Sequence, residues 1–214
     1  MNNNLTELVF ILDRSGSMAG LESDTIGGFN GMLSKQKKEQ GEAIVTTVLF
    51  DNLYEILHDR INLAGVMNIS DSDYYVRGCT ALLDAIGRTI SKISNAQKHT
   101  AESERPAKTL VVIITDGLEN ASREYSAEKV KQMIETMQKD ESWEFIFLGA
   151  NIDAVKTAQS VGIRADRAAN YHADGAGTAI NYESVCRAAT TIRTQGKVSS
   201  DWKDDIDIDF KGRK

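Results

Sequence analysis

The chain has 214 residues, of which 41% are hydrophobic and 26% are charged, and its formal net charge is -6. These values are typical of a soluble globular domain with a substantial core, and the negative charge argues against a nucleic-acid-binding protein, which needs a basic surface. No apolar stretch reaches the roughly 20 residues that cross a bilayer. Because the first residues also lack the pattern of a secretory signal, we expect a cytoplasmic protein without a membrane partner.

Apolar runs and amphipathic stretches alternate along the chain, as they do in α/β proteins. The runs over 5–13 and 108–115 are nearly continuous, which indicates strands that are covered on both faces. Ser126 is the expected N-cap of the helix after the second of these strands. The expected strands are 5–13, 43–50, 53–61, 108–115, 143–149 and 168–171, and the expected helices are 23–39, 81–97, 127–140, 153–160 and 178–194.

This succession predicts a doubly wound, mostly parallel Rossmann-like sheet with helices on both faces. Residues 43–50 and 53–61 flank a short polar turn and predict a hairpin, whose second strand is a candidate antiparallel edge strand. We expect one domain over residues 1–196. Residues 197–214 form an acidic C-terminal tail in which aspartates partly alternate with apolar residues. We expect this tail to be loosely ordered, with an edge strand as the alternative.

Side chains that carry oxygen stand at the expected carboxyl ends of two strands and at the start of a helix. Asp13, Ser15 and Ser17 follow the first strand, Asp116 follows the strand over 108–115, and Thr80 opens the helix over 81–97. Open α/β sheets bind ligands at the carboxyl ends of their strands, and hard divalent cations prefer oxygen ligands. We therefore expect these five residues to form one Mg²⁺ or Mn²⁺ site, with the two aspartates on neighbouring strands.

The mixture of hydroxyl and carboxylate ligands suggests what such a metal would do. If hydroxyls take the inner positions and the carboxylates bind through water, the metal keeps much of its positive charge. It then attracts an anionic oxygen from outside, most simply a Glu or Asp side chain of a partner protein. The expected site is a metal-mediated docking point rather than a reaction centre.

The same residues resemble a known family. Asp13-x-Ser15-x-Ser17, then Thr80, then Asp116 is similar to the metal-ion-dependent adhesion site of the von Willebrand factor type A (VWA) domain, over roughly residues 5–195. The chain looks closest to stand-alone bacterial and phage members, including those found near stress-resistance genes.

The resemblance implies roles for individual residues and a kind of partner. Ser15 and Ser17 would bind the metal directly, and Thr80 and Asp116 would exchange between direct and water-mediated contact. Asp13 would act mainly through water and through hydrogen bonds to its own loop. The resemblance also implies a protein partner that offers an acidic residue, of the kind represented by an ATPase or a stress-response component.

Other interpretations of these residues remain open. The simplest is a polar rim of helix-capping side chains. A metal-dependent phosphohydrolase is the enzyme alternative, but Ser15 stands where a haloacid-dehalogenase-type enzyme needs an acid, and no nucleophile elbow or phosphate-binding loop is evident. We therefore expect no enzyme activity. A third possibility is a self-associating structural protein, in which Asp207 or Asp209 of the tail enters the site of a neighbour.

Several further polar residues receive the simpler of two interpretations. Asp84 is interpreted as an exposed helix carboxylate rather than as support for the metal loop. Glu119 and Asn120 are interpreted as solvent-exposed loop residues rather than as the rim of the site. The glycine-rich segment 174–178 is expected to be a loop with a helix cap.

Overall fold

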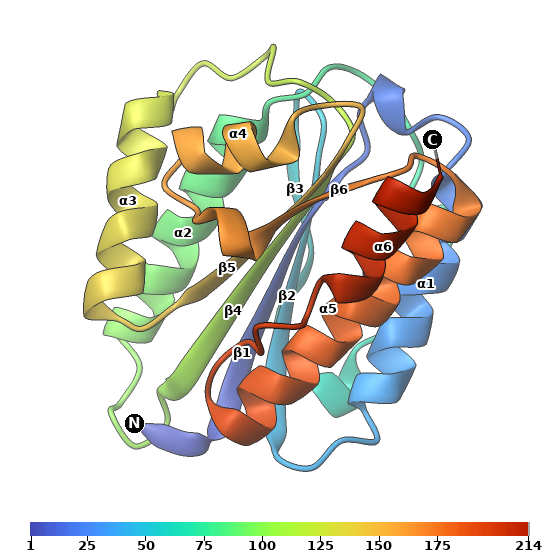
Figure 1. The fold of residues 1–214 in the computed structure, drawn as a ribbon. Helices are drawn as coiled ribbons and strands as arrows, with labels where there is room; N and C mark the ends of the chain where they lie inside the picture. The colour runs from blue at the N-terminus through green and yellow to red at the C-terminus, as the bar shows by residue number, and fades with distance from the viewer. Residues whose placement is uncertain (214) are drawn as a thin grey trace.

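The computed structural model describes residues 1–213, in which a six-stranded sheet is covered by helices on both faces (Figure 1). The strand order is β3-β2-β1-β4-β5-β6, and β3 alone runs antiparallel to its neighbour. The strands are β1 (Asn2–Asp13), β2 (Glu42–Phe50), β3 (Tyr54–Asn62), β4 (Pro106–Thr115), β5 (Glu144–Ala150) and β6 (Ala168–Tyr171). The helices are α1 (Glu22–Gln36), α2 (Leu82–Lys98), α3 (Ala127–Asp140), α4 (Ala154–Ser160), α5 (Gly175–Gln195) and α6 (Asp204–Gly212), with short 3-10 helices η1 (Gly16–Met18), η2 (Leu63–Gly65) and η3 (Ala165–Arg167).

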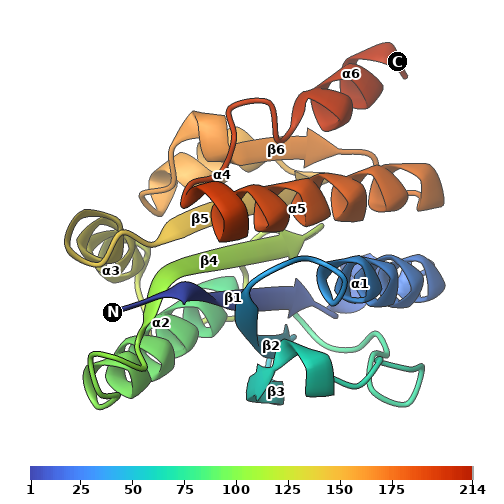
Figure 2. The ribbon, with the colours of Figure 1, turned by 90° about the horizontal axis from the view of Figure 1, so that it is seen from below.

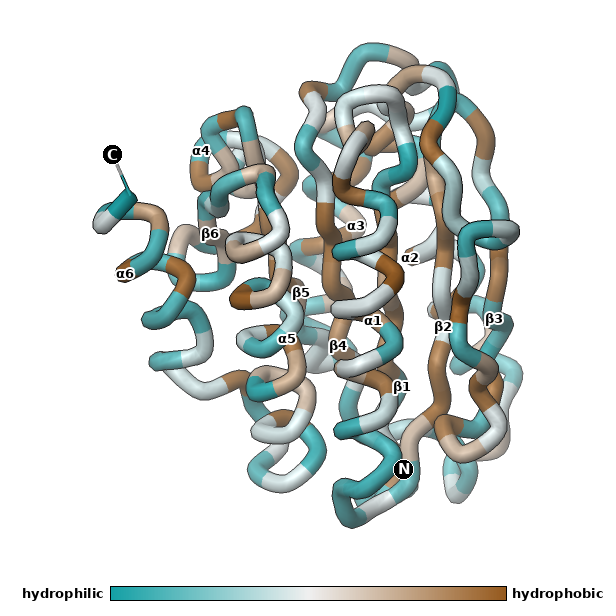
Figure 3. The backbone as a smooth tube through the Cα atoms, turned by 90° about the vertical axis from the view of Figure 1, so that its right-hand side faces the viewer, coloured by the Kyte–Doolittle hydropathy of each residue, from teal (hydrophilic) through white to brown (hydrophobic). Residues whose placement is uncertain are grey.

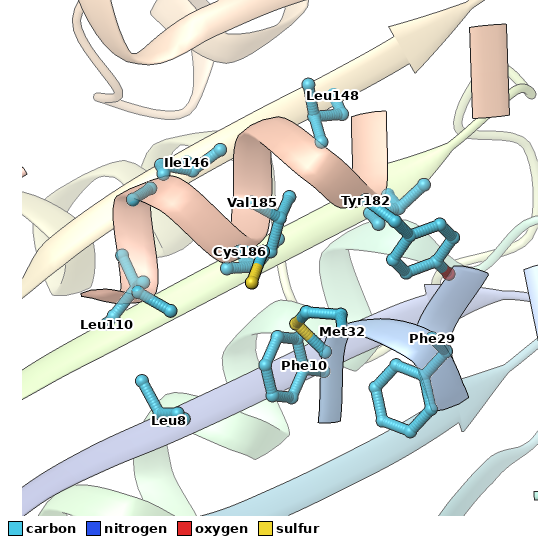
Figure 4. Packing of buried hydrophobic residues seen from close by; sticks show 14 of the residues in the cluster. Leu8, Phe10, Phe29, Met32, Leu110, Ile146, Leu148, Tyr182, Val185 and Cys186 are labelled. Atoms are coloured by element: carbon cyan, nitrogen blue, oxygen red, sulfur yellow. The ribbon is translucent and has the colours of Figure 1, made fainter. Parts of the chain in front are cut away.

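The predicted fold class is confirmed, and the central strands show why their sequences are so apolar. Successive residues of a strand point to opposite faces of the sheet. Leu8 and Phe10 of β1 therefore pack against α1 and α5, where Figure 4 shows them with Phe29 and Tyr182, while Val9 of the same strand enters the core beneath α2 and α3. Figure 2 shows these two helical layers on either side of the sheet, and Figure 3 shows hydrophobic residues concentrated along the central strands.

The order of the strands positions the candidate site. From β1 the chain moves outward through β2 to β3, then crosses back over the sheet to form β4 on the other side of β1. The loops that follow β1 and β4 therefore leave the sheet in opposite directions, which opens a crevice at their carboxyl ends. Asp13 and Asp116 flank this crevice because their strands are neighbours, as predicted.

The prediction of a loosely ordered tail or an edge strand is wrong. Residues 204–212 form the helix α6, which packs against β6 and α5, and the side chains of Trp202 and Ile206 are fully buried. The Trp202 indole donates a hydrogen bond to the carbonyl of Asp166 at 2.9 Å. Aspartates in the first turn of α6 favour a helix because they complement its positive end. The domain boundary at residue 196 stays a prediction.

Helix α5 begins earlier than the prediction of 178–194. Its first turn contains the glycine-rich segment, and the Asp174 side chain caps it by accepting a hydrogen bond from the amide of Gly177 at 2.8 Å. A Cβ atom on Gly177 would lie 2.2 Å from the carbonyl oxygen of His172, so this helical turn requires glycine there. Within residues 1–213, no helix is long and apolar enough to cross a membrane.

Candidate metal centre

Three loops meet at the carboxyl edge of the sheet and bring the predicted hydroxyls together. Thr80 Oγ1 donates a hydrogen bond to Ser15 Oγ at 2.9 Å, and the Ser15 and Ser17 Oγ atoms lie 3.0 Å apart. The third loop crosses beside them, because a Cβ atom on Gly117 would lie 2.7 Å from Thr80 Oγ1 and 2.8 Å from Ser17 Oγ. Ser15 and Thr80 are buried and Ser17 is exposed, so this group of hydroxyls reaches solvent on one side.

Asp13 lies beneath the hydroxyls and organises its own loop. Its side chain is buried, and one carboxylate oxygen accepts a hydrogen bond from the Ser15 amide at 2.7 Å. The other oxygen accepts a hydrogen bond from Thr115 Oγ1 at 2.5 Å. Asp13 therefore links the end of β1 to the end of β4 and holds the Ser15 amide in place.

Asp116 presents a buried carboxylate that lacks a hydrogen-bond partner in residues 1–213. The residue is 2% exposed, and neither carboxylate oxygen has a hydrogen-bond partner in that part of the chain. An unpaired buried carboxylate is unfavourable unless a cation or donors compensate it. Two carboxylates and three hydroxyls also match the oxygen ligands that Mg²⁺ and Mn²⁺ prefer. The residues at this position therefore fit a hard divalent cation.

The electrostatics of the two aspartates agree with this fit. Burial raises the pKa of Asp13 to about 6, against the opposing effect of the Thr115 and Ser15 hydrogen bonds, and the nearby Asp116 raises it further. Burial also raises the pKa of Asp116, which the neighbouring Ser17 hydroxyl partly offsets. Without a cation, both carboxylates carry their negative charge at a cost to the folded state.

We predict that the stability of the metal-free protein depends on pH through Asp13. The pKa of Asp13 in the folded protein, about 6, lies above its ordinary value of 3.8. Its contribution to the free energy of unfolding is therefore fully present below pH 3.8 and is lost as the pH rises through 6. The shift of about two units corresponds to about 3 kcal/mol. The free energy of unfolding, measured with urea in EDTA, should fall in the wild type relative to Asp13→Asn as the pH rises. A difference in unfolding free energy between the two proteins that does not change with pH would contradict this prediction.

The loop after β4 is tied to the loop that carries Thr80. The Asn120 side chain accepts a hydrogen bond from the Thr80 amide at 2.9 Å, and the Asn120 amide donates to the Thr80 carbonyl at 3.0 Å. The Glu119 carboxylate accepts a hydrogen bond from the Leu83 amide at 2.9 Å. Both residues lie in a loop, and Asn120 is exposed as expected while Glu119 is half-buried, but their side chains also join the two loops at the rim of the site.

Asp84 is half-buried, so its interpretation as an exposed helix carboxylate is wrong. Its two oxygens accept hydrogen bonds from three successive backbone amides, those of residues 123–125, at 2.8 to 2.9 Å. These bonds keep the pKa of Asp84 below its usual range, against the effect of its partial burial. Asp84 thus anchors the far end of the loop that begins at Asp116.

One group beside the site was not foreseen from the sequence. Arg14, which lies between two of the predicted site residues, has a fully buried side chain that pairs with the equally buried Asp51 at 3.0 Å. An arginine in a polar loop gives no sign in the sequence that it is buried. Asp51, in turn, lies at a hairpin turn, where aspartate is common for local reasons.

Elsewhere, residues 1–213 contain no group of three or more His, Cys, Asp or Glu side chains that could hold a metal ion. The candidate centre differs from such clusters because three of its five side chains carry hydroxyls rather than carboxylate, imidazole or thiol groups. Asp73, which precedes the Thr80 loop, accepts hydrogen bonds from the amide and hydroxyl of Ser70 within a turn.

The family model described as "VWA domain containing CoxE-like protein" matches residues 2–181. Among solved structures, the fold resembles a von Willebrand factor type A protein from Catenulispora acidiphila, with 13% identity and a TM-score of 0.58 over 86% of this chain and 42% of that chain. It also resembles the manganese-loaded TRAP protein of Plasmodium vivax, with 16% identity and a TM-score of 0.57 over 84% of this chain and 73% of that one.

A third similar structure is proximal thread matrix protein 1 from the mussel byssus, which has a zinc-occupied MIDAS motif. It shares 13% identity and a TM-score of 0.59 over 86% of this chain and 46% of that chain. Identities this low show a common fold and nothing more. The chain spans less than half the length of the bacterial and mussel proteins. No curated protein matches the sequence.

Proposed function

Because the chain belongs to the VWA domain family, we propose that it is a divalent-metal-dependent protein-binding module. The observation that carries this proposal is the buried Asp116 carboxylate, which has no hydrogen-bond partner in residues 1–213 and neighbours Ser17, one of three converging hydroxyls. The manganese of the TRAP protein and the zinc of the mussel protein come from distant relatives. They support a divalent cation here, which we propose to be Mg²⁺ or Mn²⁺.

The five predicted residues would hold the metal in different ways. The hydroxyls of Ser15, Ser17 and Thr80 and the carboxylate of Asp116 supply oxygens that face one another across the loops, while Asp13 keeps the Ser15 amide and the end of β4 in place. When bound, the cation supplies a positive charge that attracts a carboxylate. The exposed Ser17 side is where an acidic side chain of a partner protein would approach.

The surface around the site favours a protein as the partner. Three of the loops that surround the hydroxyls carry large apolar side chains in solvent: Leu53 is 56% exposed, Tyr75 43% and Leu118 64%. Apolar side chains next to a polar anchor are typical of a protein-binding surface. We propose a partner that offers a Glu or Asp side chain; an ATPase or a stress-response component is the class that the family resemblance suggests.

The two alternative functions receive less support. A phosphohydrolase of the haloacid-dehalogenase type needs an acid two residues after its nucleophile, and that position holds Ser15, whose hydroxyl faces Ser17 and Thr80. Self-association through the tail needs a free Asp207 or Asp209. Lys203 lies 3.7 Å from Asp207, and Arg213 lies 2.5 Å from Asp209, so both carboxylates already have partners in α6 and beside it.

Calorimetric titration tests the proposed metal binding. EDTA-treated wild-type protein should bind Mg²⁺ and Mn²⁺ at one site, and the double variant Asp13→Ala/Ser15→Ala should show only background heat because it loses a metal ligand and the carboxylate that orders its loop. Ser70→Ala/Asp73→Ala removes the same two residue types from a turn that supplies none of the five candidate ligands and should bind as the wild type does. Undiminished affinity in the Asp13/Ser15 variant would show that the metal binds elsewhere.

Once binding is established, metal-dependent capture can identify the partner. Protein loaded with Mn²⁺ should retain a partner that is released by EDTA, and the Asp13/Ser15 variant should retain none. A generic phosphate ester incubated with the loaded protein should remain intact, because the proposed module binds and does not hydrolyse.

A further inference from the structure

A cluster of the buried Arg14 and Asp51 and the partly exposed Arg77 lies next to the candidate metal centre and touches two of its loops. One carboxylate oxygen of Asp51 accepts hydrogen bonds from Arg14 Nε at 3.0 Å and from Arg77 Nε at 2.7 Å. Arg14 belongs to the loop of Ser15 and Ser17, whereas Arg77 belongs to the loop that ends at Thr80. A single oxygen atom therefore joins the two segments that supply the hydroxyls.

Backbone hydrogen bonds follow the same connection. The carbonyl of Asp51 accepts a hydrogen bond from the amide of Ala81, directly after Thr80, at 2.9 Å. The amide of Arg77 donates to the carbonyl of Arg14 at 2.8 Å. The β2–β3 turn, through Asp51, thus holds the Thr80 loop against the end of β1 from both its side chain and its main chain.

The cluster is expensive to bury, which argues that it does more than stabilise the fold. The side chains of Arg14 and Asp51 are both fully buried. Removing two charges from water costs enough that apolar residues of similar size often give equal or greater stability. What an apolar pair cannot do is accept hydrogen bonds from two arginines at one point and so hold two loops at a set separation.

We propose that Asp51 is a positioning residue, which acts through Arg14 and Arg77 to keep the Thr80 hydroxyl beside Ser15 and so sets the metal affinity of the centre. This role rests on the proposed metal binding. Asp51 itself binds no metal in this proposal, because its carboxylate is already occupied by the two arginines and by the amide of Leu53, which donates to its other oxygen at 2.6 Å.

Arg77→Gln tests this role without leaving a buried charge unpaired. Arg77 is 36% exposed, and Asp51 keeps Arg14 as its partner after the substitution. The matched control is Glu55→Gln, which removes the other partner of Arg14, a 49% exposed carboxylate at 2.7 Å that also lies 3.9 Å from Arg77, and leaves the hydrogen bond between Asp51 and Arg77 intact. Calorimetry far below the unfolding temperature should show Mg²⁺ affinity lowered roughly 10- to 100-fold in Arg77→Gln and unchanged in Glu55→Gln. Arg77→Lys, which keeps a charged donor for Asp51, should recover part of the loss.

A second measurement uses the metal-free protein. Amide hydrogen exchange of residues 77–83 should be faster in Arg77→Gln than in wild type or Glu55→Gln, because the Thr80 loop loses its side-chain anchor. If the wild type binds Mg²⁺ and Arg77→Gln binds it equally well, or if exchange in this segment is the same in all three proteins, Asp51 has no positioning role. If the wild type binds no metal, the proposed function fails and the effect on metal affinity fails with it. Faster exchange in Arg77→Gln alone would then support only the attachment of the loop.

Discussion

Replacing Asp13 by asparagine is expected to stabilise the metal-free protein while weakening its metal binding, because the centre loses one of its two negative charges. Asp13 is buried, and its pKa is raised to about 6 by that burial, so at neutral pH the folded state bears the cost of an ionised carboxylate that the unfolded chain does not. Asparagine removes the charge and keeps an oxygen that can accept the hydrogen bond from Ser15. At neutral pH the gain in the free energy of unfolding should approach about 3 kcal/mol, which corresponds to the rise of about two units in the pKa of Asp13.

Urea unfolding in EDTA measures the change in stability of the metal-free protein, and calorimetric titration with Mg²⁺ measures the change in metal affinity. Asp73→Asn is the appropriate comparison, because hydrogen bonds from Ser70 hold the pKa of Asp73 below its usual range. That substitution should leave stability unchanged or slightly reduced, and metal binding intact. A metal-free Asp13→Asn protein that is less stable than wild type would contradict the view that this position sacrifices stability for ligand binding.

Replacing Trp202 by alanine is expected to cost about 3 to 5 kcal/mol in the free energy of unfolding, which is the range for a large buried aromatic side chain. Trp202 is fully buried, its indole donates to the carbonyl of Asp166, and Ile206 joins the same core one turn later. The C-terminal segment is therefore part of the packed structure.

Ile208→Ala provides the control for this substitution. Ile208 lies on the same helix α6 but is 69% exposed, so its loss should change stability by no more than about 0.5 kcal/mol. Urea or thermal unfolding of both variants is sufficient. A Trp202→Ala protein that unfolds like the wild type would mean that the segment after residue 196 packs too weakly to contribute, as an independent tail would.

Local patterns in the sequence predicted most of the elements. Helix α3 and strand β6 have the predicted bounds, and Ser126 caps α3 by accepting a hydrogen bond from the amide of Lys129. These predictions succeed because periodicity and capping depend on residues within a few positions of one another. The early start of α5 was missed, since glycines in the first turn are needed for a close approach to His172 rather than for a loop.

The sequence by itself determined the fold class and which residues stand at the crevice. Strands that are apolar throughout must be covered on both faces, and their order along the chain puts Asp13, Thr80 and Asp116 at one edge of the sheet. Whether these residues, with Ser15 and Ser17, bind a metal stays a proposal, but their gathering followed from two strand ends and the start of one helix.

Only the tertiary structure decided how each polar side chain is satisfied. The partners of Arg14, Asp84 and Asn120 lie 37 to 41 positions away in the sequence, and no local pattern indicates such pairs. The sequence also gives no sign that Asp116 lacks a hydrogen-bond partner, because this depends on every neighbouring loop. Nor does it show that Trp202 is buried, because its burial depends on η3, α5 and β6. Burial and hydrogen bonding are properties of the assembled chain, and they determine which of the predicted residues carries unsatisfied charge.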